Sequence, residues 1–354
     1  MTAVLILHAY SAENAGDGLL VDHAVAIVRE AVGVDAAITV VAGYPESFSY
    51  LDVERVVSSK PTRRGYCAEY LSILRAIDSF DLVVGVGGGY LRAGHTLEAV
   101  KMLLSHGPQL WRAAGTSAFT VYLPQSVGPL RFGTRRLIER LMSRLDLVMY
   151  RDDTSMRELP AAGAVRRADL AAVGIGHARG RELDPADLVP VLSFRSVRGV
   201  VPTGIADVAD ALGTFDGYTQ STVSGNDDTA AMETVGYRRM LTRDEFMQPG
   251  ATPRVVIAMR LHAALMALEV GHYVIHLAYE RKGYGAFGDL ALSEYVFDSQ
   301  KFDATTVCGL ARQLLHDPFA RQRYDAAIAA TMTVRQAQHD DLIARITAGV
   351  GVRA

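Results

Sequence analysis

The sequence predicts an α/β protein of two units, each a parallel sheet with helices on both faces. Two observations lead to this prediction. The chain has 354 residues, which corresponds to two domains at roughly 150 residues each. Short apolar runs alternate with segments of helical apolar spacing, and this alternation is typical of βαβ units. Hydrophobic residues make up 49% of the chain, which is enough for two cores.

In the first half, buried apolar runs predict strands that alternate with amphipathic helices. The expected strands are 4–8, 38–42, 53–58, 82–86, 119–123 and 147–150. The expected helices are 18–32, 66–77, 96–114 and 135–145. Connections of this length between neighbouring strands require parallel pairing. The strand that begins at Phe119 is expected to stop at Pro124, which has no N–H for a sheet hydrogen bond.

The second half repeats the pattern after a polar stretch, residues 174–188, which we interpret as a linker. The expected strands are 189–194, 218–223, 255–259 and 273–278, with helices at 205–212, 227–234 and 261–270. The chain after Thr305 is expected to be mainly helical, with a break near Pro318. We therefore expect domains at 1–175 and 189–330, and a C-terminal helix at 331–354.

Composition excludes several classes of protein. The chain has 36 basic and 39 acidic residues, so it lacks the basic excess of nucleic-acid-binding domains. Its two cysteines cannot build a disulfide framework, which favours the cytoplasm. The first ten residues lack the basic start of a signal peptide, and no apolar run reaches the roughly 18 to 20 residues of a membrane span.

The strongest chemical signal lies at the ends of two strands in the second half. Arg260 and His262 form the turn from a strand into a helix, where backbone N–H groups and the helix dipole favour an anion. Lys282 follows the next strand. If the strands are parallel neighbours, these side chains leave the sheet at one edge and suit a multiply charged anion with proton transfer. The alternative is a helix start with surface charges.

Turns of the first half carry further candidates. Arg151 leaves the end of a strand, and Asp153 or Thr154 is expected to cap the helix that follows. The glycines at 85–89 lack the spacing of a phosphate-binding loop, so we interpret them as sites of close backbone approach. In the turn at 14–17, Gly16 allows the turn and Asp17 can cap the next helix.

Two further patterns have structural explanations. His272 and His276 are four residues apart, as in metal-binding helices, but the segment predicts a strand, and we do not expect a metal site. Arg136, Arg140 and Arg144 share one helical face, which either faces solvent or contacts anionic lipid headgroups.

Taken in order, these segments resemble the polysaccharide pyruvyl transferase family. The family's motifs correspond here to Asn14-Ala-Gly-Asp17, Asp81–Gly89, Gln125–Pro129, Arg151-Asp152 with Ser155 and Leu159, Asp169, Ser193–Arg195, Arg260-Leu-His262, Gly271, and Tyr279 with Lys282. His272 and Tyr273 depart from the family pattern. The second unit is also short, which affects acceptor contacts more than donor contacts.

The resemblance implies a fold and an activity. The fold is glycosyltransferase-B-like: two Rossmann-like domains facing a cleft, with the acceptor on the N-terminal side and phosphoenolpyruvate on the C-terminal side. The activity is transfer of the enolpyruvyl group of phosphoenolpyruvate to a sugar of a cell-surface or exopolysaccharide precursor, as a cyclic ketal with release of phosphate. The acceptor is a sugar or a lipid-linked oligosaccharide, and the enzyme works in the cytoplasm or at the inner face of the membrane.

The resemblance also assigns roles to residues. The catalytic residues would be His262, Arg260, Lys282 and Arg151. The substrate-binding residues would be Asn14, Gly16, Asp17, Gly87, Gly88, Gly89, Gln125, Ser126 and Tyr279. Phosphoenolpyruvate is a co-substrate, and the scheme needs no metal or other cofactor. The alternatives are a sugar-nucleotide-dependent glycosyltransferase of the same fold and a non-catalytic carbohydrate-binding relative.

Overall fold

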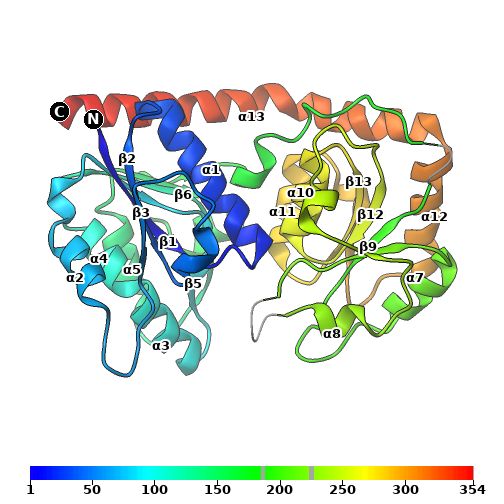
Figure 1. Cartoon of the computed structure of the whole chain (residues 1–354), viewed down its shortest axis with the longest axis horizontal. Helices are drawn as coiled ribbons and strands as arrows, with labels where there is room; N and C mark the ends of the chain where they lie inside the picture. Colours follow the sequence, from blue (N-terminus) through cyan, green and yellow to red (C-terminus); the bar gives the residue numbers. More distant parts are fainter. Residues whose placement is uncertain (185–187, 223–226, 354) are drawn as a thin grey trace. The chain divides into compact units, whose positions relative to one another are not determined.

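The computed structural model describes residues 1–184, 188–222 and 227–353, which form two compact α/β units (Figure 1). The first unit comprises Met1–Ala12, Asp17–Leu170 and the chain from Gln336 onward. The second comprises Glu13–Gly16 and Ala171–Arg335. The Glu13–Gly16 turn lies within the range expected for the first domain but belongs to the second unit. The chain from Gln336 onward was expected to be a separate C-terminal helix but belongs to the first unit. The linker expected at 174–188 includes residues 185–187, which lie outside the described residues.

The first unit is built on a parallel sheet in the order β3-β2-β1-β4-β6-β7-β8, with β5 paired to β6. Its strands are β1 (Ala3–Ala9), β2 (Ala37–Ala42), β3 (Arg55–Ser58), β4 (Leu82–Gly85), β5 (Gly88–Ala93), β6 (Phe119–Leu130), β7 (Leu147–Tyr150) and β8 (Val165–Arg166). Along the chain, β2 and β3 are added on one side of β1, and β6, β7 and β8 are added on the opposite side, beyond β4. The boundary between β1 and β4 is therefore the switch point, where ligands bind in open α/β sheets.

Six helices of this unit connect the strands. They are α1 (Ala15–Val32), α2 (Ala68–Arg75), α3 (Thr96–Ser105), α4 (Gly107–Ala113), α5 (Thr134–Met142) and α6 (Asp153–Glu158). The single helix predicted at 96–114 is wrong, because Pro108 cannot continue a helix and instead occupies the first turn of α4. The strand predicted to stop at Pro124 continues to Leu130, pairing with β5 beyond that proline.

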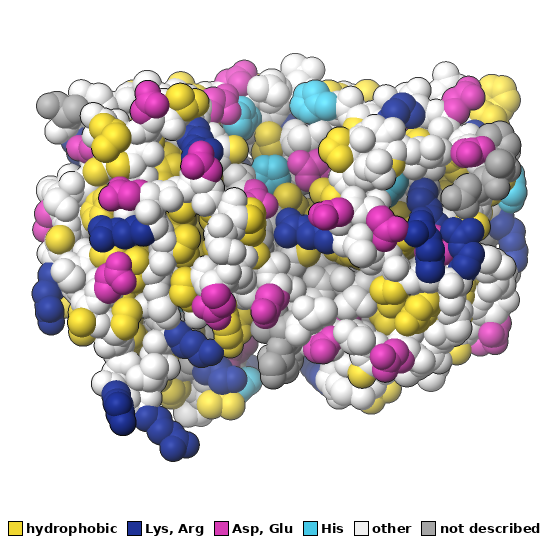
Figure 2. Space-filling view, viewed as in Figure 1, with side chains coloured by type: hydrophobic (Ala, Val, Ile, Leu, Met, Phe, Trp, Pro, Cys, Tyr) yellow, Lys and Arg dark blue, Asp and Glu magenta, His cyan; other side chains and the backbone are white. Residues whose placement is uncertain are grey.

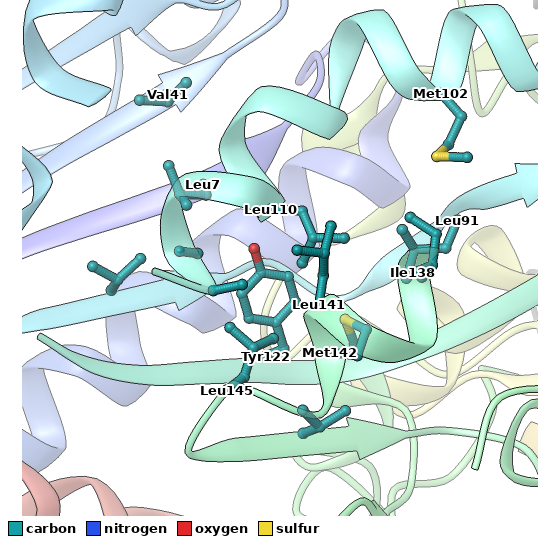
Figure 3. Close-up of a cluster of buried hydrophobic side chains, with 14 of the residues drawn as sticks. Leu7, Val41, Leu91, Met102, Leu110, Tyr122, Ile138, Leu141, Met142 and Leu145 are labelled. Carbon is teal, nitrogen blue, oxygen red and sulfur yellow. The ribbon is translucent and has the colours of Figure 1, made fainter. Parts of the chain in front are cut away.

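Alternating side chains of β1 reach two separate cores, as expected for a sheet covered on both faces. Leu5 and Leu7 belong to the core that Figure 3 shows, in which β-strand side chains pack against α4 and α5. Val4 and Ile6 belong to the core on the other face, which the end of α13 also covers.

The second unit has a smaller parallel sheet in the order β11-β10-β9-β12-β13-β14. Its strands are β9 (Val191–Ser193), β10 (Asp216–Tyr218), β11 (Met240–Leu241), β12 (Val255–Ala258), β13 (Tyr273–Ala278) and β14 (Val296–Asp298). The strand predicted at 218–223 is wrong: β10 ends at Tyr218, and Val223 lies outside the described residues. Here the switch point falls between β9 and β12.

The helices of the second unit are α7 (Gly204–Leu212), α8 (Thr229–Met232), α9 (Arg243–Phe246), α10 (Leu261–Glu269), α11 (Arg281–Asp289) and α12 (Ala304–His316). The last helix, α13 (Pro318–Arg353), begins after the predicted break and contributes residues to both units. None of the described helices combines the length and the hydropathy that a membrane span requires.

Candidate functional site

The predicted cationic residues of the second unit lie at the carboxyl edge of its sheet. Arg195 follows β9 and Arg260 follows β12, which are neighbours in register at Ser193 and Ala258. These two strands flank the switch point of the sheet. Glu280 and Lys282 follow β13, which pairs with the other side of β12. The topology therefore brings the ends of three strands to the place where an α/β sheet binds its ligand.

Arg260 is held by a buried carboxylate. Its Nε and Nη2 atoms donate to the two oxygens of Asp228 at 2.5 and 2.6 Å, and the two residues are 8% and 1% exposed. Burial raises the pKa of Asp228, while the hydrogen bonds and charge of Arg260 act in the opposite direction. This forked pair fixes the plane of the guanidinium at the start of α10.

Arg195 adds a second cation to the same carboxylate. Its Nε lies 3.9 Å from Oδ1 of Asp228, and its guanidinium carbon lies 5.5 Å from the centre of the Tyr279 ring. Tyr279 thus lies beside Arg195 at this cluster. Two guanidinium groups thus lie against the same carboxylate, at the ends of two neighbouring strands.

His262 lies in the first turn of α10, beside the turn at Asn14–Gly16. A β-carbon added to Gly16 would lie 2.2 Å from Nδ1 of His262, so only a glycine leaves room for the imidazole. The turn is part of the second unit: Asn14 forms a β-bridge with Ser221, and the N–H of Ala15 donates to the carbonyl of Gln220 at 3.3 Å. Asn14 and Gly16 therefore join the cluster of Arg260 and His262.

The helix start at this turn differs from the prediction. The helix begins at Ala15, and the side-chain oxygen of Asn14 accepts a hydrogen bond from the N–H of Gly16 at 3.3 Å. Asp17 lies within the first turn of α1 and belongs with the first unit. The expected capping role thus falls to Asn14, because the helix starts earlier than its apolar spacing indicates.

Lys282 lies near the start of α11, where its Nζ is 2.9 Å from Oε2 of Glu280. The next residue, Gly283, packs directly on His276, because an added β-carbon would lie 2.3 Å from Nε2 of that histidine. His276 also hydrogen-bonds the carbonyl of Ala258 at 2.8 Å and stacks on Phe287. Within the described part of the chain, no group of three or more potential ligands could hold a metal ion.

Arg151, the predicted cation of the first unit, is buried at the end of β7. Its Nη1 lies 2.5 Å from Oδ2 of Asp169, and its Nε donates to Oγ of Ser126 at 2.8 Å. Arg151 and Asp169 are 4% and 2% exposed. The charge of Arg151 is therefore compensated inside its own unit, and Asp169 sets its orientation.

The helix after Arg151 is capped by Asp152, so the expectation of Asp153 or Thr154 is wrong. Oδ1 of Asp152 accepts from the N–H of Ser155 at 2.8 Å. Its Oδ2 accepts from the hydroxyls of Ser126 and Ser155 at 2.7 and 2.8 Å. The Asp152 carboxylate thus ties β6 to α6 and holds Ser126 beside Arg151.

The glycines after β4 allow close backbone approach, as the sequence predicts. A β-carbon on Gly87 would lie 2.7 Å from the carbonyl oxygen of Pro124 in β6. A β-carbon on Gly89 would be 3.7 Å from Nη2 of Arg151. Gly88 pairs with Gln125 in the β5–β6 register. Gly87, Gly88, Gly89, Gln125, Ser126 and Arg151 therefore form one cluster in the first unit.

The predicted site residues thus fall into two clusters, one in each unit. Asp228 was not a candidate, because it lies 32 residues before its partner and no spacing rule connects them. Arg195 was recognised within its motif but not chosen as a site residue. Its position directly after a strand was the available signal.

Comparison with known proteins supports this description. The model of the family described as polysaccharide pyruvyl transferase matches residues 14–174. No curated protein sequence matches the chain significantly. The resemblance expected from the motifs is confirmed for the matched residues.

Solved structures confirm the fold. A trehalose-6-phosphate synthase, OtsA, is 10% identical with a TM-score of 0.58, over 98% of this chain and 99% of that one. UDP-GlcNAc 2-epimerase from Neisseria meningitidis, bound to UDP-GlcNAc, is 10% identical with a TM-score of 0.53, over 97% and 100% of the two chains. A trehalose 6-phosphate synthase from Burkholderia multivorans is 12% identical with a TM-score of 0.52, over 100% and 99%. The chain has the expected glycosyltransferase-B-like fold with two Rossmann-like domains.

Proposed function

Because residues 14–174 belong to the polysaccharide pyruvyl transferase family, we propose that the protein is a phosphoenolpyruvate-dependent ketal pyruvyltransferase. It joins the pyruvyl unit of phosphoenolpyruvate to two hydroxyls of a sugar of a cell-surface or exopolysaccharide precursor, as a cyclic ketal, and releases phosphate. Phosphoenolpyruvate is the donor and the second unit binds it, while the first unit binds the acceptor.

The observation that carries this proposal is the cluster of Arg195, Arg260 and His262 at the switch point of the second sheet. Phosphoenolpyruvate carries a phosphate and a carboxylate, which need several cations, and a guanidinium group can bind either in a forked manner. The N-terminus of α10 adds backbone N–H groups and the positive end of the helix dipole. Lys282 supplies a further positive charge at the end of the adjacent strand.

The chemistry requires one group that moves protons near neutral pH. A proton adds to the methylene carbon of phosphoenolpyruvate while one acceptor hydroxyl adds to the neighbouring carbon and loses its proton. The second hydroxyl then attacks that carbon, and its proton leaves with the departing phosphate. His262 is suited to give and take these protons, and such catalysis contributes about 10²- to 10⁴-fold. The cations stabilise the developing negative charge on the phosphate.

In this proposal Gly87, Gly88, Gly89, Gln125 and Ser126 contact the acceptor, and Asp17 belongs to the same side. Arg151 acts beside Ser126, oriented by its ion pair with Asp169. Asn14, Gly16 and Tyr279 shape the donor side around His262 and Arg195.

The activity test uses two variants at the donor cluster. His262→Ala should lower phosphate release from phosphoenolpyruvate at least 100-fold, with donor affinity changed less than about 3-fold, because the imidazole moves protons rather than holding the donor. Arg260→Lys keeps the positive charge but cannot form the two parallel hydrogen bonds to Asp228. It should weaken donor binding about 10-fold or more. The exposed His316→Ala serves as the matched control. Intact turnover in His262→Ala would contradict the assignment.

A sugar-nucleotide glycosyltransferase is the second candidate, favoured by the structural similarity to nucleotide-sugar enzymes such as the epimerase bound to UDP-GlcNAc. The two activities differ in the leaving group. Release of phosphate from phosphoenolpyruvate supports the pyruvyltransferase, whereas release of a nucleoside diphosphate with no phosphate release would support the glycosyltransferase.

Membrane contact with a lipid-linked acceptor forms a further part of the proposal. Arg136 and Arg140 are exposed on α5, and Arg144 lies just beyond its end. On α3, Leu97, Val100 and Leu104 are 60%, 47% and 48% exposed, an apolar stripe that suits a membrane surface. Flotation with anionic liposomes should be reduced by replacing the three arginines or by serine at the three apolar positions. Absence of flotation of the unmodified protein would contradict membrane contact.

A further inference from the structure

The first unit contains a cavity whose lining includes just one of the proposed acceptor residues, Gly89. It has a volume of about 640 Å³ and lies at the carboxyl ends of β1, β2 and β3, where Tyr10, Tyr44 and Lys60 follow the three strands. Tyr90 of β5 and His106 at the end of α3 complete the aromatic part of its wall. This size and this mixture of rings and polar groups are typical of a small-molecule site.

A buried hydrogen-bond chain supports the wall of the cavity. The hydroxyl of Tyr122 is 2.8 Å from Nε2 of His8, and Nδ1 of His8 is 3.2 Å from Nδ1 of His106. Tyr90 stacks on both imidazoles, with ring centres 4.6 and 4.4 Å away. The rings are therefore held in place, and His106 lines the cavity with Nδ1 engaged by His8.

The position of His8 is itself unusual. Its φ of 70° lies in the left-handed region, and the pairing of β1 with β2 is irregular between Ile6 and Ala9. Its N–H donates to Oε1 of the buried Gln109 at 2.8 Å, which holds the backbone in this conformation. A strained residue that is held by several partners is a common feature of binding sites.

Both histidines remain neutral at ordinary pH. Burial lowers the pKa of His106 to about 4, and burial followed by the charge of His106 lowers the pKa of His8 well below its usual value. A neutral imidazole can accept a hydrogen bond through one nitrogen while the other is engaged. Nε2 of His106 can therefore form a hydrogen bond with a ligand hydroxyl, as donor or acceptor according to the tautomer that its contact with His8 selects.

The rim of the cavity is basic. Lys60, Arg92 and Lys101 line it together with one acidic residue, Glu98, which pairs with Arg92 at 3.3 Å. In the described part of the chain, no carboxylate forms an ion pair with Lys60 or Lys101, and Nζ of Lys60 lies 4.0 Å above the Tyr44 ring. Figure 2 shows basic side chains gathered at the lower left, at the end of the first unit that carries α3 in Figure 1.

Lysines are rare in this protein, which makes their placement informative. The sequence contains four of them, and two line this one cavity. A lysine ammonium is a compact point charge on a flexible chain that suits a phosphate group. The cavity thus combines a wall that can hydrogen-bond the hydroxyls of a sugar ring with a basic rim that can bind a phosphate group.

We propose that this cavity binds a glycosyl phosphate, with the sugar hydroxyls against His106 and Tyr90 and the phosphate at Lys60 and Lys101. The inference rests on the proposed function only in taking this ligand as the acceptor. A glycosyl phosphate unit occurs both in nucleotide sugars and in lipid diphosphate sugars, and the cavity recognises the chemistry that they share.

The test measures binding by calorimetry in the absence of phosphoenolpyruvate. The probes are the 1-phosphates of glucose, galactose and mannose, with the corresponding methyl glycosides. At least one hexose 1-phosphate should bind 10-fold or more tightly than its methyl glycoside. Lys60→Ala/Lys101→Ala should abolish this preference, and Lys301→Ala, an exposed lysine in the second unit, should leave it intact. A preference that persists in the double variant, or no binding of any hexose 1-phosphate, would overturn the proposal.

Two further measurements examine the wall and the ligand source. His106→Phe keeps the stacking but removes the nitrogen that hydrogen-bonds the ligand, and should weaken binding of the hexose 1-phosphate about 10-fold, with partial rescue in His106→Gln. Equal affinity in His106→Phe would overturn the role of His106. Tighter binding of a UDP-hexose or of a farnesyl diphosphate hexose over the hexose 1-phosphate supports the proposal and identifies the natural source.

The outcome is separable from that of the proposed function. Donor binding is measured with phosphoenolpyruvate on the same double variant, which should bind it normally. An unmodified protein that releases phosphate from phosphoenolpyruvate but binds no hexose 1-phosphate would leave the pyruvyltransferase in place and remove the cavity assignment. Normal sugar-phosphate binding without any affinity for phosphoenolpyruvate would do the reverse.

Discussion

At the scale of single residues, two arginines at the carboxyl edges of the sheets are each held by a buried carboxylate. Arg260 forks onto Asp228, and Arg151 pairs with Asp169. Both arginines could be predicted because each directly follows an apolar strand. Asp228 could not, because only the fold brings it to its partner from 32 residues away along the chain.

The Arg151 pair leads to a stability prediction. Arg151→Met should lower the free energy of unfolding by about 3 to 5 kcal/mol, because it removes a buried charge that forms an ion pair with the buried Asp169 carboxylate. The double variant Arg151→Met/Asp169→Leu should recover most of this loss. Urea unfolding measures both. Arg345→Met, which breaks the exposed pair with Asp341, should change stability by less than about 1 kcal/mol. A double variant as unstable as the single one would contradict the pairing argument.

The contact between Gly16 and His262 leads to a second prediction. Gly16→Ala should lower phosphate release at least 10-fold, because the new methyl group would displace the imidazole rather than a flexible chain end. The melting temperature should change little, since alanine favours the helix that begins here. Gly309→Ala in α12, where an added β-carbon meets nothing within 4 Å, is the matched control. Unchanged turnover in Gly16→Ala would place His262 outside the reaction.

At the scale of elements, most strands and helices could be predicted from apolar spacing, and the errors have local causes. Pro108 divides the expected helix at 96–114, and Asn14 starts α1 before its apolar stripe begins. β5 was missed because a strand with two glycines carries no apolar pattern, and its pairing with β6 stabilises it instead.

Packing of α11 on β13 leads to a third prediction. Gly283→Ala should destabilise the protein by about 1 to 3 kcal/mol and raise the KM for phosphoenolpyruvate, because the added carbon would push α11, and with it Lys282, away from His276. Gly288→Ala lies on the same helix, where the nearest neighbour is a hydroxyl 3.8 Å away, and should be tolerated. Thermal unfolding and donor kinetics compare the two. Equal losses of stability in Gly283→Ala and Gly288→Ala would show that helix propensity, and not packing against His276, determines the effect.

At the scale of the whole molecule, buried neutral histidines couple the fold to pH. Burial lowers the pKa values of His106, His272 and His276 to about 4. The unfolded chain therefore binds more protons than the native state below about pH 6.5, and stability falls as the pH decreases from 6.5 toward 4.

This gives a fourth prediction, measured by urea unfolding at pH 7 and pH 5. Each of these histidines should account for a loss of about 2 kcal/mol in the free energy of unfolding between the two values. His272→Gln should reduce the loss by that amount and still accept the hydrogen bond from the N–H of Arg254. The exposed His316→Gln should not change it. The opposite sign, with higher stability at pH 5, would contradict neutral burial.

The sequence by itself determined the two-unit α/β architecture, the parallel sheets and the resemblance of residues 14–174 to the polysaccharide pyruvyl transferase family. These depend on apolar periodicity and on short motifs, which are local properties of the chain. It also located Arg260, His262 and Lys282, because each follows a strand end. Only the tertiary structure decided what these side chains contact: Asp228 for Arg260, and Gly16 for His262. It also revealed the cavity, because Lys60 follows β3 and Lys101 lies on α3, and no local pattern in the sequence records that these two lysines line one cavity.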